Sequence, residues 1–307
     1  MRPPIELEQR LTCRRRAEEL HRKGRRAHGR GDYILRHDRL VGPVLRTALR
    51  AAGLYRRGCR NAVRPVVRHT SVRIPRLPSS FSHFRILHMS DFHIDGVQGL
   101  AEVIAETVSA NPVDACVLTG DYRFATEGEY DLVLPRMRTV LSGVQSHYGI
   151  IGVLGNHDCA DLAVGLSKIG VRMLINDAIE LRKGGDSIWI AGVDDPHYYG
   201  CDDLGQALEG VPERSTRILL AHSPEIYEEA ASAGIQLYLC GHTHGGQICL
   251  PWLGPVILNA KCPREYTYGA WHHRSLQGYT SAGVGCSMLP VRYNCPPEVT
   301  VLELVTD

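Results

Sequence analysis

The sequence has no apolar stretch that approaches the ~18 uninterrupted residues of a membrane-spanning helix. Its N-terminus is charged from Arg2 onward and lacks the apolar segment of a secretory signal peptide. None of the ten cysteines forms a Cys-x-x-Cys pair, and Cys116 and Cys240 stand in apolar runs typical of buried thiols. These absences favour a reducing environment. We expect a cytoplasmic protein, with peripheral association with the inner membrane as an open alternative.

Charge is distributed unevenly along the chain. Residues 1–80 hold 21 Lys and Arg residues against 6 Asp and Glu, whereas the other residues hold 14 against 27. We therefore predict a basic N-terminal extension, residues 1–80, followed by an acidic domain, residues 81–307. A basic extension indicates an anionic partner, which is a membrane surface, a nucleic acid or the domain itself.

The extension contains one amphipathic segment, residues 40–57, whose apolar side chains fall on one helical face. Its arginines, among them Arg46 and Arg50, lie elsewhere around the helix. Two interpretations stay open: the helix lies in an anionic membrane interface, or it docks on the domain. Residues 1–39 are Arg-rich and weakly periodic, and we expect a solvated arm. Prolines and serines at residues 75–80 predict a linker.

From residue 84 onward, short apolar runs alternate with helical patterns, which favours an α/β fold with a helix-covered sheet. The predicted helices are 97–110, 129–141 and 225–233. The predicted strands are 86–89, 115–118, 149–154, 188–191, 217–221, 235–240 and 299–305, with β-hairpins from residue 266.

Polar side chains follow five of these strands, at the point where each strand ends. They are Asp91 and His93, Asp121, Asn156 and His157, His222, and finally His242 and His244. Because ligands bind at the carboxyl ends of strands in open α/β sheets, we expect these groups to converge. Imidazole, carboxylate and amide donors without a thiolate suit Mn, Fe or Zn. Glycines flanking His242 and His244 let the backbone turn tightly enough to aim both rings inward.

In this order, Asp-x-His, Gly-Asp, Gly-Asn-His-Asp, a single His and Gly-His-x-His resemble the calcineurin-like metallophosphoesterase superfamily over about residues 84–305. The resemblance implies a β-sandwich of two mixed sheets flanked by helices. It also implies two divalent metal ions that hold a bridging hydroxide for phosphoester hydrolysis. Asp121 would bridge the ions, and His157 would protonate the departing oxygen. One ion would be held by Asp91, His93, Asp121 and His244, and the other by Asp121, Asn156, His222 and His242.

The chain departs from the family pattern at Phe124. Many members have Gly-Asp-x-x-Asp, and the last Asp orients the catalytic His, so the sequence leaves the partner of His157 open. Residues 245–251 and 283–298 are similar to a bacterial subgroup with membrane-associated phosphodiesterases and UDP-2,3-diacylglucosamine pyrophosphatases. For Arg292, binding of a second phosphate and an ion pair with Glu298 both stay open.

These features favour a metal-dependent phosphodiesterase or pyrophosphatase. Its expected substrate is a phosphodiester or pyrophosphate that is membrane-associated or part of a nucleotide-lipid. An anionic membrane surface is the expected partner of residues 1–80. A nuclease is disfavoured because the arginines cluster outside the acidic domain. A general phosphatase and a non-catalytic binding scaffold on the same fold are the remaining alternatives.

Overall fold

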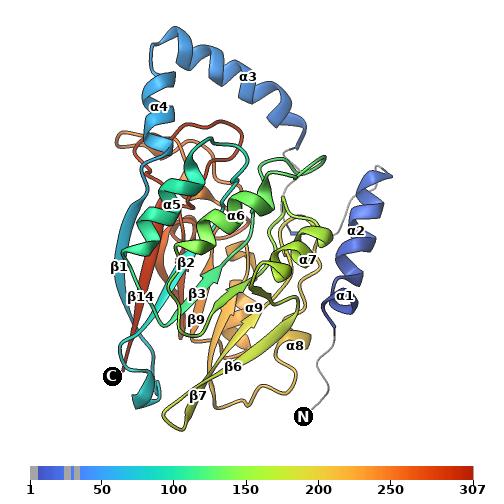
Figure 1. The fold of residues 1–307 in the computed structure, drawn as a ribbon, viewed down its shortest axis with the longest axis vertical. Helices are drawn as coiled ribbons and strands as arrows, with labels where there is room; N and C mark the ends of the chain where they lie inside the picture. Colours follow the sequence, from blue (N-terminus) through green and yellow to red (C-terminus); the bar gives the residue numbers. More distant parts are fainter. Residues whose placement is uncertain (1–5, 24–28, 31–34, 307) are drawn as a thin grey trace.

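A computed structural model describes residues 6–23, 29–30 and 35–306 of the chain. Two six-stranded mixed sheets pack face to face, and helices cover their outer faces (Figure 1). The first sheet has the order β1-β14-β2-β3-β4-β5, with β1 Val66–Arg73, β14 Glu298–Val305, β2 Phe84–Met89, β3 Ala115–Leu118, β4 Ile150–Gly152 and β5 Val171–Met173. The second has the order β12-β13-β9-β8-β7-β6, with β12 Gly269–His273, β13 Leu276–Thr280, β9 Leu237–Cys240, β8 Thr216–Leu220, β7 Asp186–Gly192 and β6 Asp177–Lys183.

Alternation along the central strands assigns each side chain to one of two buried layers. In β2, Phe84 and Ile86 belong to the core between the sheets, whereas Leu87 and Met89 face the covering helices. In the parallel neighbour β3, Val117 belongs to the core between the sheets and Cys116 faces the covering helices. Strands buried on both faces read as continuous apolar runs, which is why the sequence located these strands well.

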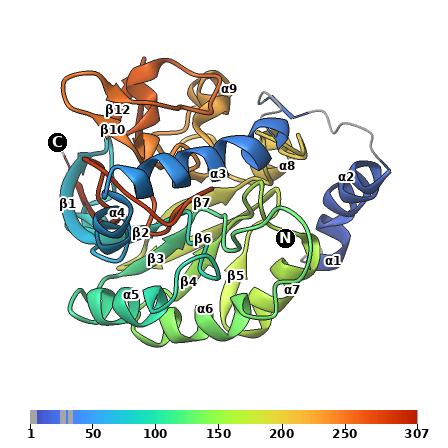
Figure 2. The ribbon, with the colours of Figure 1, turned by 90° about the horizontal axis from the view of Figure 1, so that it is seen from above.

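Helices lie on both outer faces of the sandwich. α5 Leu100–Ser109, α6 Val133–Ser142 and α7 Ala160–Lys168 run in a row along the first sheet (Figure 2). α8 Leu204–Ala207 and α9 Tyr227–Ser232 pack on the second sheet. The predicted fold of two mixed sheets flanked by helices is thereby confirmed, as are the C-terminal strand and the hairpin of β12 and β13.

The expectation of a solvated arm over residues 1–39 is wrong for the part that forms two helices, α1 Leu7–Arg10 and α2 Thr12–Arg22. Residues 1–5, 24–28 and 31–34 of this arm lie outside the described residues. Leu11 is fully buried in the core that the first sheet shares with α5, α6 and α7. Arg14 is also fully buried, lies 3.9 Å above the Tyr199 ring and pairs with Asp194 at 3.3 Å. Its guanidinium donates to the Gly155 carbonyl oxygen as well. A buried ion pair thus joins the basic extension to the catalytic domain.

The predicted helix over residues 40–57 is two helices, α3 Leu35–Ala51 and α4 Tyr55–Ala62. Gly53, at φ 70°, ends α3 in the left-handed conformation that glycine adopts readily. Val44 on the predicted apolar face is 69% exposed, so this part of the face is not docked on the domain. No helix in the described part of the chain is long and apolar enough to span a bilayer.

Strand β1 comes from the stretch that the sequence assigned to the extension. It pairs in parallel with β14 from Val66 opposite Glu298 to Arg73 opposite Val305. The edge of the first sheet is therefore built from residues before the predicted linker. The division at residue 80 stays a prediction about folding units.

Replacing Arg14 with Ala should destabilise the protein by about 3 kcal/mol, because Asp194 would keep a buried charge without its cationic partner. Arg15 on the same helix is the matched control: its pairs with Glu8 and Asp161 are exposed, so Arg15→Ala should cost less than about 1 kcal/mol. Urea unfolding followed by circular dichroism measures both. Equal, small effects would contradict the docking of α2.

Candidate metal centre

The predicted site residues converge at one end of the sandwich. Asp91 follows β2, Asp121 follows β3 and Asn156 follows β4, all in the first sheet. His222 follows β8 and His242 follows β9, in the second sheet. The site is therefore assembled where the carboxyl ends of parallel strands from both sheets meet.

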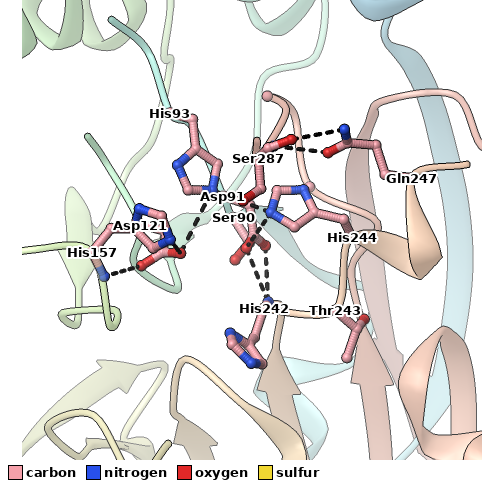
Figure 3. A network of polar contacts seen from close by, with 12 residues as sticks. Ser90, Asp91, His93, Asp121, His157, His242, Thr243, His244, Gln247 and Ser287 are labelled. Carbon is pink, nitrogen blue, oxygen red and sulfur yellow. Dashed lines mark hydrogen bonds and ion pairs between the residues drawn. The ribbon is translucent and has the colours of Figure 1, made fainter. Parts of the chain in front are cut away.

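In the described part of the chain, three groups of side chains have donor atoms close enough together to hold a metal ion, and the third, His93, Asp121 and His157, shares members with the other two. In the first, His93 Nε2 lies 3.1 Å from His244 Nε2, and His244 Nε2 lies 3.4 Å from an Asp91 oxygen (Figure 3). In the second, His222 Nε2 lies 3.3 Å from Asp121 Oδ2 and 3.2 Å from His242 Nδ1. These are the carboxylates and imidazoles that the resemblance divided between two ions.

Asp121, a member of the second group, also lies close to the first group. Its Oδ2 is 3.6 Å from His93 Nε2 in the first group and 3.3 Å from His222 Nε2 in the second. The same oxygen lies 3.9 Å from His157 Nε2. One carboxylate oxygen is thus shared by imidazoles from three different loops.

Backbone carbonyls fix the orientation of three of these rings. His93 Nδ1 donates to the Arg123 oxygen at 2.8 Å, His222 Nδ1 to Thr119 at 2.8 Å and His242 Nε2 to Asn259 at 2.6 Å. A carbonyl oxygen can only accept, so the bonded nitrogen carries the proton and the other nitrogen faces the cluster. This arrangement is typical of histidines that ligate a metal.

Asn156 supplies an independent test of whether a metal fits. Its Oδ1 is buried and has no hydrogen-bond partner in the part of the chain that the structure describes. A buried amide oxygen without a partner is costly, and a cation next to it would remove that cost. The orphaned oxygen and the oxygen and nitrogen donors fit a divalent ion.

The loops that carry the donors have strained backbones. Positive φ angles, which bulky residues rarely adopt, occur at Asp91 (53°), His93 (39°), Asp121 (55°), His242 (73°) and His244 (52°). Gly245 and Gly246 also have positive φ, which glycine adopts without strain in a tight turn. Gly241 has a different role, because a Cβ there would overlap Ser90 Oγ and the Asp91 carboxylate.

Asp158 holds two of these loops in place, and sequence reasoning gave it no role. Its carboxylate, fully buried, accepts the backbone N–H groups of Asp121, Tyr122 and Gly155, each at 2.8 Å. The sequence signal that could have identified Asp158 is its place at the end of the Gly-Asn-His-Asp motif, residues 155–158.

The structure identifies the partner of His157 that Phe124 left open. His157 Nδ1 donates to the backbone oxygen of Phe124 at 2.6 Å, so the main chain takes the place of the missing carboxylate. The Phe124 N–H in turn donates to Asp95 at 2.6 Å. The His157 side chain is 17% exposed, which leaves its Nε2 within reach of a substrate.

His197 is a second neighbour of the site. Its ring centroid lies 3.9 Å from that of His242, and its Nδ1 lies 3.0 Å from Glu225. Asp194 and Asp195 in the same loop are fully buried, and both accept backbone N–H groups that hold the loop.

Neither interpretation of Arg292 holds. Its side chain is fully buried, and it donates to the backbone oxygens of Ala282, Gly283 and Gly285. Glu298 pairs with Arg68 at 2.7 Å instead. Arg292 therefore braces the loop beside His244 and cannot reach a second phosphate.

Asp121 and His222 of the second group shift each other's pKa in opposite directions. Burial raises the pKa of the Asp121 carboxyl, but His222, His157 and His93 outweigh that effect and hold it well below its usual value. Burial lowers the pKa of His222, but Asp121 and Asp91 raise it to about 10. A metal ion that binds His222 Nε2 must therefore displace a proton.

A two-sheet α/β sandwich with clustered aspartates and histidines at its strand ends defines a metal-dependent phosphoester hydrolase. The sequence matches the calcineurin-like phosphoesterase profile over residues 84–246. The chain belongs to the calcineurin-like phosphoesterase family.

Relatives of known sequence agree with this assignment. The chain is 29% identical over 278 residues to the uncharacterized metallophosphoesterase YkuE of Bacillus subtilis (strain 168), covering 86% of this chain and 94% of that one. It is 29% identical over 250 residues to phosphodiesterase YaeI of Escherichia coli (strain K12), covering 78% and 88%. A solved structure, the 5'-nucleotidase precursor from Thermus thermophilus, matches with a TM-score of 0.42 and 13% identity over 72% of this chain and 54% of that chain.

Metal affinity should rise with pH, by roughly tenfold per unit between pH 6 and 8, because one proton leaves His222 for each ion bound there. Titration calorimetry with Mn²⁺ in two buffers of different ionisation enthalpy measures the released proton directly. Affinity independent of pH, with no proton release, would contradict the coupling of His222 to Asp121.

Proposed function

We propose that the protein is a two-metal phosphodiesterase or pyrophosphatase. Asp91, His93, Asp121 and His244 would hold one ion, and Asp121, Asn156, His222 and His242 the other. The observation that carries the proposal is the position of Asp121 Oδ2 between imidazoles of both groups. Oxygen and nitrogen donors without a thiolate support Mn, Fe or Zn.

Two bound divalent ions would supply Lewis acidity toward phosphoryl oxygens and a nucleophile at neutral pH. The chain's own contribution to bond cleavage is His157. Because its Nδ1 proton is committed to the Phe124 oxygen, Nε2 carries a proton only in the imidazolium form. The imidazolium gives this second proton to the departing oxygen, and the Phe124 carbonyl stabilises the positive charge before transfer.

For the substrate, we propose a phosphodiester or pyrophosphate that is membrane-associated or part of a nucleotide-lipid, reached by a protein bound peripherally at the inner membrane. Exposed arginines on α3 and α4 support an anionic surface as partner. A relative 30% identical over 269 residues, from Bos taurus, is called a transmembrane protein with metallophosphoesterase domain; this chain covers 59% of it. A nuclease is disfavoured by the acidic balance of residues 81–307.

With added Mn²⁺, the protein should hydrolyse bis-p-nitrophenyl phosphate. Asp121→Ala and His242→Ala should each lower kcat/KM at least ~100-fold, because the positions that stabilise transition-state charge are lost. His272→Ala is the control, since this exposed histidine lies outside the metal-binding groups. Release of p-nitrophenolate measures the rate, and undiminished activity in the first two variants would refute the site.

His157→Ala should slow cleavage according to the leaving group. For an alkoxide leaving group, as in glycerophosphoethanolamine, we expect a loss of ~100-fold or more, because the departing oxygen needs a proton. For p-nitrophenolate, which leaves without protonation, we expect a loss smaller than ~10-fold. Equal losses on both substrates would show that His157 does not act as the acid.

A further inference from the structure

An uncharged segment beside the metal centre places large apolar side chains in solvent. Residues 245–260 contain no charged residue. Within them, β10 Cys249–Leu250 pairs with β11 Gly254–Pro255 in a short antiparallel hairpin. We define residues 249–257 as the apolar hairpin. Its exposed side chains are Leu250 (48%), Trp252 (103%), Leu253 (74%), Val256 (56%) and Ile257 (46%).

The turn of the apolar hairpin points its most exposed residue, Trp252, into solvent at a cost to the backbone. Trp252 has φ 62°, and the Leu253 N–H donates to the Pro251 oxygen at 2.8 Å, which is a three-residue turn. Glycine would take this conformation without strain, whereas a bulky residue does not. Trp252 packs against none of the described residues, so its strained conformation contributes nothing to the fold, which points to an external contact.

The apolar hairpin is fastened to the metal centre at both ends. On its N-terminal side, a Cβ at Gly246 would overlap Pro255, so the hairpin lies directly against the loop of His244. On its C-terminal side, Asn259 accepts the hydrogen bond of His242 Nε2. A surface that binds the hairpin therefore lies close to the metal ligands.

The extension reaches this region of the molecule, because orange and red loops lie beneath α4 in Figure 1. Tyr293 makes the connection: its backbone oxygen accepts from the Cys249 N–H, and its hydroxyl donates to the Leu54 oxygen at 2.7 Å. Leu54 lies at the corner between α3 and α4, next to the exposed Arg56 and Arg57. An apolar tip beside exposed arginines complements an anionic lipid surface.

We propose that the apolar hairpin inserts into the interface of an anionic phospholipid bilayer, with Trp252 and Leu253 at the acyl boundary and the arginines of α3 and α4 on the headgroups. Tryptophan favours this depth because its ring is both apolar and polar. Insertion sets the metal centre at the membrane surface, where the phosphate of a lipid-bearing substrate lies. The role of insertion in reaching a substrate rests on the proposed hydrolase function, whereas insertion of the hairpin does not require hydrolysis.

Flotation of the full chain with vesicles of phosphatidylcholine and phosphatidylglycerol in equal parts tests the contact. Trp252→Ala/Leu253→Ala should lower the partition coefficient by about tenfold or more, because binding scales with the apolar area inserted. Leu132→Ala is the matched control, since Leu132 is 55% exposed at the start of α6, outside the apolar hairpin. Arg56→Gln/Arg57→Gln should weaken binding about fivefold per arginine on these vesicles and not on pure phosphatidylcholine.

Hydrolysis of bis-p-nitrophenyl phosphate by the same variants separates the two proposals. Unchanged hydrolysis with lost flotation supports insertion, whereas flotation without hydrolysis by the wild type would overturn the proposed function alone. Insertion is overturned if the wild type does not float, or if the hairpin variant floats like the Leu132 control. It is also overturned if the hairpin substitutions change only the oligomeric state in sedimentation, which would make this surface a protein interface.

Discussion

The Asp121 carboxylate is the group on which the arrangement of the site depends. Imidazoles from both sheets face one of its oxygens, and its other oxygen accepts the backbone N–H of His157. Gathering so many donors around one carboxylate requires backbone angles that side chains rarely tolerate. Asp158 offsets part of that strain by accepting three N–H groups from the loops of Asp121 and Gly155.

The basic extension divides into parts with different physical roles. In α2, Arg14 is sealed inside the protein against Asp194 and Tyr199, so its charge serves the fold. In α3 and α4, the arginines after residue 45 are exposed, and their charge is available to a partner. The charge count of residues 1–80 combined these two populations, and only burial distinguishes a structural arginine from one that faces solvent.

At Phe124 the site lacks the usual aspartate side chain, yet the orientation of the His157 ring is kept. The usual carboxylate both orients a histidine and stabilises its charged form, and a backbone carbonyl can do both through one hydrogen bond. Here the Phe124 carbonyl points at His157 because Asp95 holds the N–H of the same residue. A substitution that weakens the pattern in the sequence therefore leaves the ring oriented.

The sequence by itself determined the central strands, the α/β class and the donors at the strand ends, because periodicity and short motifs are local properties. The arrangement in two sheets was expected only from the resemblance to a known family. Tertiary structure decided the features that join distant residues. The pairing of β1 with β14 and the contact of Arg14 with Asp194 depend on which of several compatible surfaces bury each other. The uncharged stretch around Trp252 has the composition of a buried segment, and composition alone does not distinguish a buried apolar residue from an exposed one. Only packing leaves it in solvent.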